Sequence, residues 1–386
     1  MNTRPAPRLS VLDVSPVFAD SSPARALRET VELARRVDAL GYHRFWVAEH
    51  HGIDNIASCS PPVLIGLIAG ATSRLRVGSG GVMLANHSPL IVAEQFGTLE
   101  ALHPGRIDLG VGRAPGADRI TAHALRRAGD ADDFTGRLGE LLSYFGPSEG
   151  SAASTDAPGG GHPAVRALPA LDASPEMWLL GSSGYSAELA GLLGLPFAFA
   201  QHFSPTLAAA AVQLYRERFR PSAVLGRPYV VISSMVVAAE TDEEARWQAG
   251  PMMLTSLLQR TRGISDLHAT PEQAAKFPYS REEAAFVQDR LASHLVGGPQ
   301  TVGAKARELL DATGADELMA LTMVHDLETR VRSYRILADE LLPDRADTDG
   351  ASTGATDTDT TATDPAGTDT AATDTAGGTR AGAGGA

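Results

Sequence analysis

Cysteine and long apolar runs are both scarce in this sequence. Cys59 is the single cysteine in 386 residues, so an internal disulfide framework is excluded and a reducing compartment is favoured. We expect Cys59 to be buried as a small apolar residue rather than to act as a thiol. No apolar run reaches the ~18 residues of a transmembrane helix, and residues 1–8 lack the apolar segment of a secretory signal. These absences predict a soluble, cytoplasmic protein.

Basic residues are also in the minority. The chain has 33 Lys and Arg against 46 Asp and Glu, a formal net charge of −13. Eight Asp and two Arg after Pro343 contribute −6 of that charge, so nearly half of the acidic excess lies in the last segment. The remainder is only mildly acidic. We therefore expect no nucleic-acid partner, because such binding depends on a basic surface.

Two segments lack the apolar residues that a core requires. Residues 344–386 consist mainly of Asp, Thr, Ala and Gly, so burial cannot offset the entropy of ordering and we expect a disordered tail. Residues 148–162 are rich in Ser, Ala, Gly and Pro, which predicts a flexible insertion. We expect residues 1–343 to form a single domain that contains this insertion.

Within that domain, short apolar runs alternate with longer amphipathic segments. In residues 23–40, for example, Leu27, Val31, Ala34 and Val37 share one helical face, and Gly41 follows as a helix terminator. Eight strand–helix units predict an α/β fold with a parallel sheet closed into a (βα)8 barrel of the TIM type. The predicted strands are 9–12, 44–47, 75–78, 107–110, 177–180, 197–200, 230–237 and 318–322. The predicted helices are 23–40, 61–73, 90–102, 132–145, 185–194, 206–219, 300–313 and 327–342, with helical material in 242–295 broken at Gly263, Pro271 and Pro278.

Chemically distinctive residues follow six of the predicted strands. Because active sites of such barrels lie at the carboxyl ends of the strands, we expect these residues to share one rim. They are Asp13 and Ser15, the run Glu49-His50-His51, Gly80-Gly81, Arg113, the run Gly181-Ser182-Ser183, and Gln201-His202.

The run from Gly181 to Ser186 leaves a strand and opens a helix. Free backbone N–H groups at a helix start favour an anion, and three serine hydroxyls add donors. Arg113 would suit the same phosphate, although a serine-rich helix cap without a ligand is the alternative. The GxGxxG and GxxxxGK[ST] patterns are absent, so we expect the monophosphate of FMN or a similar cofactor.

The run Glu49-His50-His51 permits three interpretations. Adjacent histidines on a strand point in opposite directions, so we expect no metal site. A structural pair is the second interpretation, and a neutral catalytic histidine is the third. Gly80 and Gly81 are either a glycine-rich strand end or a place where the backbone passes close to a flat ring.

Three blocks together resemble the bacterial-luciferase-like (LLM-class) flavin monooxygenases. They are FWVAEHH at 45–51, VGSGGVML at 77–84 continuing through SPLIVAEQ at 88–95 to LHPGRIDLGVGR at 102–113, and WLLGSSGYS at 178–186. The resemblance covers roughly residues 9–341 and implies reduced FMN, molecular oxygen, a small organic substrate, a homodimer and a separate NAD(P)H-dependent flavin reductase.

The resemblance also implies roles for single residues. His50 matches the catalytic histidine of the family, and Gly80-Gly81 matches a non-proline cis peptide that lies against the flavin ring. Gly112 and Ser182 stand where light-emitting relatives carry a cysteine and an acidic residue, so we expect no bioluminescence and place the chain nearer the bacterial biosynthetic branch. An F420-dependent hydride-transfer enzyme and a non-catalytic flavin-binding protein are the alternatives. Positions expected at the cofactor are Gly80, Gly81, Arg113, Gly181, Ser182, Ser183, Tyr185 and Ser186.

Overall fold

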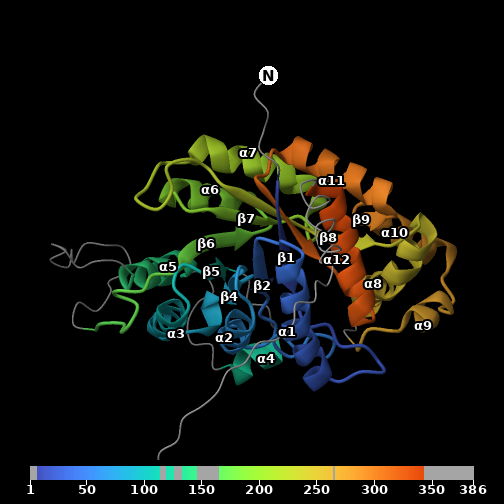
Figure 1. Cartoon of the computed structure of the whole chain (residues 1–386), viewed down its shortest axis with the longest axis horizontal. Helices are drawn as coiled ribbons and strands as arrows, with labels where there is room; N and C mark the ends of the chain where they lie inside the picture. Colours follow the sequence, from blue (N-terminus) through green and yellow to red (C-terminus); the bar gives the residue numbers. More distant parts are fainter. Residues whose placement is uncertain (1–6, 114–118, 126–132, 146–164, 264–265, 343–386) are drawn as a thin grey trace, which may run out of the picture. The chain divides into compact units, whose positions relative to one another are not determined.

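Eight parallel strands close into a barrel in the computed structural model, which describes residues 7–113, 119–125, 133–145, 165–263 and 266–342. The strand order is β10-β1-β2-β3-β5-β6-β7-β8, and pairing of β8 with β10 closes the ring. Helices surround the strands (Figure 1). The (βα)8 prediction is therefore confirmed. The barrel strands are β1 (Arg8–Asp13), β2 (Arg44–Val47), β3 (Arg76–Ser79), β5 (Ile107–Gly112), β6 (Glu176–Gly181), β7 (Phe197–Ala200), β8 (Val230–Ala238) and β10 (Glu317–Leu321).

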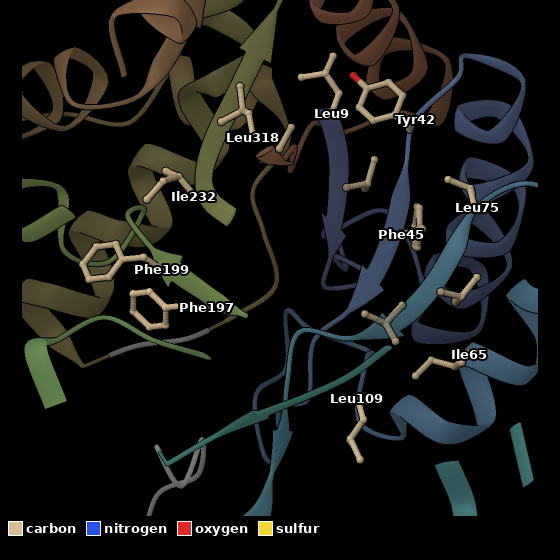
Figure 2. Close-up of a cluster of buried hydrophobic side chains, with 14 of the residues drawn as sticks. Leu9, Tyr42, Phe45, Ile65, Leu75, Leu109, Phe197, Phe199, Ile232 and Leu318 are labelled. Carbon is tan, nitrogen blue, oxygen red and sulfur yellow. The ribbon is translucent and has the colours of Figure 1, made fainter. Parts of the chain in front are cut away.

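Alternate residues of each strand face two different layers. Leu9, Phe45 and Phe199 point outward into a large cluster beneath the helices (Figure 2). Trp46 and Trp178 belong instead to a smaller cluster, and their rings meet edge to face at 5.2 Å. The period-2 alternation thus gives the strands an outer layer under the helices and an inner layer.

The helices are α1 (Pro23–Ala39), α2 (Pro61–Ala71), α3 (Pro89–Leu102), α4 (Arg119–Ala124), α5 (Phe134–Ser143), α6 (Gly184–Leu193), α7 (Ala208–Arg218), α8 (Asp242–Arg262), α9 (Pro271–Ala275), α10 (Arg281–Ala292), α11 (Pro299–Thr313) and α12 (Leu327–Leu341).

Two short strands were not predicted. β4 (Val82–Met83) pairs with β5 after the Gly80-Gly81 step, and β9 (Leu295–Gly297) pairs with β8. The helical interpretation of residues 242–295 was therefore wrong at its end, where β9 begins at Leu295. The two-residue β4 and the three-residue β9 are too short for a period-2 pattern to become visible in the sequence.

The segment after β8 folds as three helices, and its breaks follow local rules. α8 begins at the N-cap Thr241, whose side chain accepts from the Glu244 N–H, and three acidic residues fill its first turn. It ends at Gly263, which takes a left-handed conformation with φ of 65°. Pro271 then opens α9 in its first turn, so the break expected at Pro271 lies at the start of a helix.

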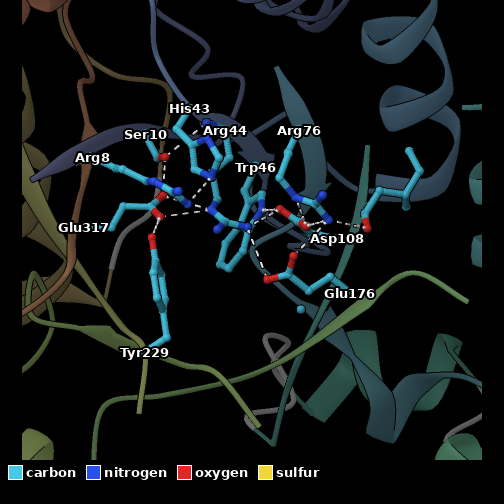
Figure 3. Close-up of polar contacts among 12 residues, drawn as sticks. Arg8, Ser10, His43, Arg44, Trp46, Arg76, Asp108, Glu176, Tyr229 and Glu317 are labelled. Carbon is cyan, nitrogen blue, oxygen red and sulfur yellow. Dashed lines mark hydrogen bonds and ion pairs between the residues drawn. The ribbon is translucent and has the colours of Figure 1, made fainter. Parts of the chain in front are cut away.

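A buried charged network occupies the amino-terminal ends of the strands (Figure 3). Arg44, at the start of β2, donates from Nε to Glu317 at 2.9 Å and from Nη1 to Asp108 at 2.9 Å. Trp46 and Arg76 also donate to Asp108, at 2.8 Å and 2.6 Å. Every ion in this network therefore has a partner, which is the condition under which charges are tolerated in a core.

Some expectations lie outside the described residues. The insertion at 148–162 and the tail at 344–386 belong there, while the described residues all fall within one compact unit, Met1–Pro343. None of the described helices is both long and apolar enough to cross a bilayer. Cys59 is exposed, so the expectation of burial was wrong. It lies in the loop between β2 and α2, after Ser58, whose hydroxyl donates to the Ala48 carbonyl.

Candidate active site

One cavity of about 1240 Å³ lies at the carboxyl ends of the strands. Gly112, Gly181 and Ala200, at the ends of β5, β6 and β7, contribute to its wall, and Trp46 and Met319 line it from β2 and β10. Further wall residues come from α8 and α10 of the segment after β8. A pocket at this end of the strands is where barrels of this type carry their sites. All nine residues proposed from the sequence line it: His50, Gly80, Gly81, Arg113, Gly181, Ser182, Ser183, Tyr185 and Ser186.

Other residues of the predicted rim do not line the cavity. Asp13 is buried in an ion pair with Arg330, and its other oxygen accepts from Thr30 Oγ1 at 2.6 Å and from the Ser15 N–H at 2.8 Å. Asp13 and Ser15 therefore join β1 to α1 and α12. Gln201 is buried as well and lies outside the cavity lining.

The turn from Gly181 to Ser186 carries several donors without protein partners. Ser183 is the N-cap of α6, yet its side chain makes no capping hydrogen bond. No hydrogen bond joins the hydroxyls of Ser182, Ser183 or Ser186 to another described residue. A Cβ on Gly181 would lie 2.0 Å from Ser186 Oγ, so only glycine fits there. The Arg113 guanidinium lies 4.5 Å above the Tyr185 ring. These features form a cradle of N–H, O–H and guanidinium donors suited to an anion.

Gly80 and Gly81 line the inner part of the cavity and are joined by a cis peptide bond. A Cβ on Gly81 would lie 2.7 Å from the Gly110 carbonyl oxygen, which is backbone and cannot turn away. A Cβ on Gly80 would lie 2.5 Å from the tip of the Leu12 side chain. The segment is thus packed tightly against Gly110 and Leu12, and both glycines line the cavity.

Two histidines in the cavity are held in the neutral form. Burial lowers the pKa of His50, and Nδ1 of this ring has no hydrogen-bond partner among the described residues. Burial also lowers the pKa of His202 to about 4, while Nδ1 of that ring contacts Ser233 Oγ at 3.0 Å. A neutral imidazole can accept a proton and can donate its N–H in a hydrogen bond, so His50 is chemically competent for the role expected of it.

Glu49 anchors the strand end beside His50. Its buried carboxylate contacts Nε2 of His51 at 2.8 Å and Nε2 of His87 at 2.7 Å, and accepts from the Met83 N–H at 3.1 Å. The contact with His87 lowers the pKa of Glu49, against the effect of burial. The Glu49, His51 and His87 ligand atoms lie within 4.8 Å of one another, a spacing that a cation could also bridge. The hydrogen bond from the Met83 N–H to Glu49 connects the end of β2 to β4 and so supports the Gly80-Gly81 segment between them.

The sequence did not identify several residues of the outer cavity wall. His268 lines the cavity, is 3% exposed and leaves Nε2 without a partner among the described residues. Arg260 and Arg290 line it from α8 and α10. These residues belong to the segment after β8, and no spacing motif marks them, because only the folding-back of that segment brings them to the site.

Comparison with known proteins identifies the family. The family model for luciferase-like monooxygenases matches residues 8–317. The chain belongs to this family. A luciferase-like monooxygenase of Escherichia coli (strain K12) is 42% identical over 86% of this chain and 96% of its own length. The uncharacterised protein YvbT of Bacillus subtilis (strain 168) is 47% identical over 88% of this chain and 98% of its own. The crystal structure of apo-MsnO8 is 38% identical, with a TM-score of 0.77 over 86% of this chain and 98% of that one.

Proposed function

We propose that this protein is a monooxygenase that uses reduced FMN and molecular oxygen to oxidise a small organic substrate. The observation that carries the proposal is the arrangement of one cavity. Arg113 and the serine turn lie in its wall together with Gly80, Gly81 and His50. A phosphate cradle, an open glycine surface and a neutral histidine are the three parts that such a reaction requires.

The residues of the turn fit the phosphate of FMN. Hydroxyls of Ser182, Ser183 and Ser186, the first N–H groups of α6 and the Arg113 guanidinium would hold it. Gly80 and Gly81 would lie against the flat ring, because both line the cavity beside the turn. When bound, reduced FMN supplies the electrons that activate oxygen.

The protein's own task is to position groups and exclude water. His50 would hold or transfer a proton beside the ring, because burial keeps the imidazole neutral and its Nδ1 free. Leu12, Met235 and Leu321 provide apolar wall that keeps water from the reacting atoms. Lower water access favours substrate oxidation over release of hydrogen peroxide.

Relatives support this reading. The N-acetyl-S-alkylcysteine monooxygenase of Bacillus subtilis (strain 168) is 32% identical over 87% of this chain and 98% of its own length. The fold is shared with the oxygenating constituent of 3,6-diketocamphane monooxygenase in complex with FMN, at 19% identity and a TM-score of 0.62. That protein is named as the oxygenating constituent of its enzyme, so the proposal includes a separate flavin reductase that would supply reduced FMN to this chain.

An F420-dependent hydride-transfer enzyme is the second candidate. An F420-dependent secondary alcohol dehydrogenase shares the fold, at 14% identity and a TM-score of 0.59. The two candidates differ in their need for oxygen. We expect substrate-dependent oxygen consumption with reduced FMN and a reductase, and no turnover with F420 under nitrogen. Turnover with F420 under nitrogen, without oxygen consumption in air, would favour the second candidate instead.

A homodimer is part of the proposal. α2 contains no charged or polar side chain, and Val63 and Leu67, one helical turn apart, are 66% and 59% exposed. Ile91 of the neighbouring α3 is exposed as well. A helix that is apolar on all sides is normally buried, so a second copy of this chain would cover α2 and α3. Leu67→Glu should shift the mass in light scattering from dimer to monomer; a wild-type monomer would contradict the dimer.

A further inference from the structure

The charge of the cavity differs from that of the chain. Among the described residues that line it there are three arginines and neither Asp nor Glu, although the chain as a whole has a net charge of −13. Arg113 is assigned above to the FMN phosphate. The proposed function gives no role to Arg260 and Arg290.

Arg260 and Arg290 form one feature on two packed helices. Phe286 and Arg290 are four residues apart on α10, so their side chains share a face, and both line the cavity. Arg260, in the last turn of α8, places its guanidinium 5.1 Å from the centre of the Phe286 ring. The aromatic ring thus holds one guanidinium beside the helix face that carries the other. We call Arg260, Phe286 and Arg290 the arginine lip.

Neither arginine of the lip is neutralised by the described part of the chain. Both are absent from the ion pairs, whereas Arg307, on the nearby α11, pairs with Glu340. The hydrogen-bond contact of Arg290 is a long one, 3.5 Å, to the His202 carbonyl. Burial and the charge of Arg260 together lower the pKa of Arg290. Two cations therefore face the same space with no carboxylate between them, which favours an anion that enters from outside.

Much of the remaining cavity wall is apolar and adaptable. Five of the eight methionines of the chain line it. Methionine side chains are flexible and polarisable, so such a wall accepts apolar groups of varied shape. A cationic lip beside an apolar wall would suit a molecule with one anionic end and one apolar end. The five are Met83, Met235, Met252, Met319 and Met323.

We propose that the arginine lip selects an organic anion as the substrate, with a carboxylate or sulfonate bound by Arg260 and Arg290 and the apolar part directed toward His50. This inference rests on the proposed monooxygenase function and names its substrate class. Planar guanidinium groups match the two oxygens of a carboxylate or sulfonate better than a neutral hydroxyl does. The lip also acts before binding, because the exposed Arg260 and the half-buried Arg290 attract anions from solution at low salt.

Binding of matched probes tests the lip without relying on turnover. Octanoate and octanesulfonate have the apolar chain of octanol but add a charge. The full-length protein, loaded with reduced FMN under nitrogen, is titrated with each probe by calorimetry. We expect both anions to bind at least tenfold more tightly than octanol. We also expect the double variant Arg260→Gln/Arg290→Gln to lose that preference.

Arg262→Gln is the matched control. Arg262 lies on the same helix two residues beyond Arg260, but its guanidinium lies near Phe277 and it does not line the cavity. The control should bind the anions within twofold of the wild type. Equal binding of octanol and octanoate, or no binding of either anion up to millimolar concentration, would overturn the proposal, as would an equal loss in the control.

A separate titration with reduced FMN distinguishes this inference from the proposed function. If wild-type protein does not bind FMN, the proposed function fails whatever the lip does. If the double variant loses affinity for FMN rather than for the anions, the two arginines serve the cofactor and the substrate inference fails alone.

Discussion

Strands β2 and β6 begin with polar side chains that have partners within the protein and lead to polar side chains that have none among the described residues. β2 begins with Arg44, which two buried carboxylates hold, and leads to His50, whose Nδ1 has no partner in the described chain. β6 begins with Glu176, beside Arg76 at 3.1 Å, and leads to the serine turn, whose hydroxyls bond to no other described residue. The polar groups that begin these two strands are therefore satisfied internally, whereas the His50 Nδ1 and the serine hydroxyls that follow them are left available. The paired charges at the strand starts stabilise the fold, and the free groups after the strand ends can bind a ligand.

The largest effect is expected from breaking the amino-terminal network. Arg44→Met should lower the free energy of unfolding by about 3–5 kcal/mol, because Glu317 and Asp108 remain buried while they lose a cation. Denaturant titration measures this change. The exposed Arg35, paired with Glu32 on α1, is the control, and Arg35→Met should cost at most about 0.5 kcal/mol. A cost below about 1 kcal/mol for Arg44→Met would show that the network is dispensable.

At the carboxyl end, His50→Ala should change the reaction rather than the fold. We expect coupled substrate oxidation to fall by about 10²-fold or more, since a positioned acid–base group is lost. Affinity for reduced FMN should stay within about threefold, a difference of about 0.6 kcal/mol. Oxygen consumption, peroxide release and FMN titration are measured together. Parallel loss of FMN affinity and coupled oxidation would remove His50 from the acid–base role.

Gly81→Ala tests the tight packing beneath the cofactor surface. Its Cβ would approach the Gly110 carbonyl oxygen to 2.7 Å, so we expect a loss of about 1–3 kcal/mol in stability together with weaker FMN binding. Gly226→Ala is the control, because a Cβ there meets nothing within 4 Å. Equal thermal stability of the two variants would contradict the close packing.

The buried histidines of the cavity predict a pH effect of smaller size. Burial lowers the pKa of His268 to about 4, below the ordinary value near 6.5. The unfolded chain therefore takes up this proton first, and stability should be constant above about pH 6.5 and fall as the pH decreases toward 4. His268→Gln should reduce the slope of unfolding free energy between pH 5 and 6 by about 1 kcal/mol per pH unit. An unchanged slope would mean that His268 does not contribute.

The contrast between the two ends also explains what could be predicted. Strand ends, and with them His50, Gly80 and Arg113, were predictable because period-2 runs are local and the residues after them fall on one rim. The structural role of Asp13 could not be predicted, because its partner Arg330 lies 317 residues away in the sequence. Arg260, His268 and Arg290 were missed for the same reason: their segment reaches the cavity only through the packing of α8 on α10. Cys59 was assigned to the core from composition, although its place in a loop decides its exposure.

The central claim is that the carboxyl end keeps its donors free for a flavin phosphate. The most direct measurement compares reduced FMN with reduced riboflavin, which lacks the phosphate, under nitrogen by calorimetry in the wild type and in Arg113→Gln. The account predicts that the wild type binds FMN at least tenfold more tightly than riboflavin, a difference of about 1.4 kcal/mol or more. It predicts that Arg113→Gln loses most of this difference while its affinity for riboflavin stays unchanged. Equal binding of the two flavins by the wild type would contradict the claim.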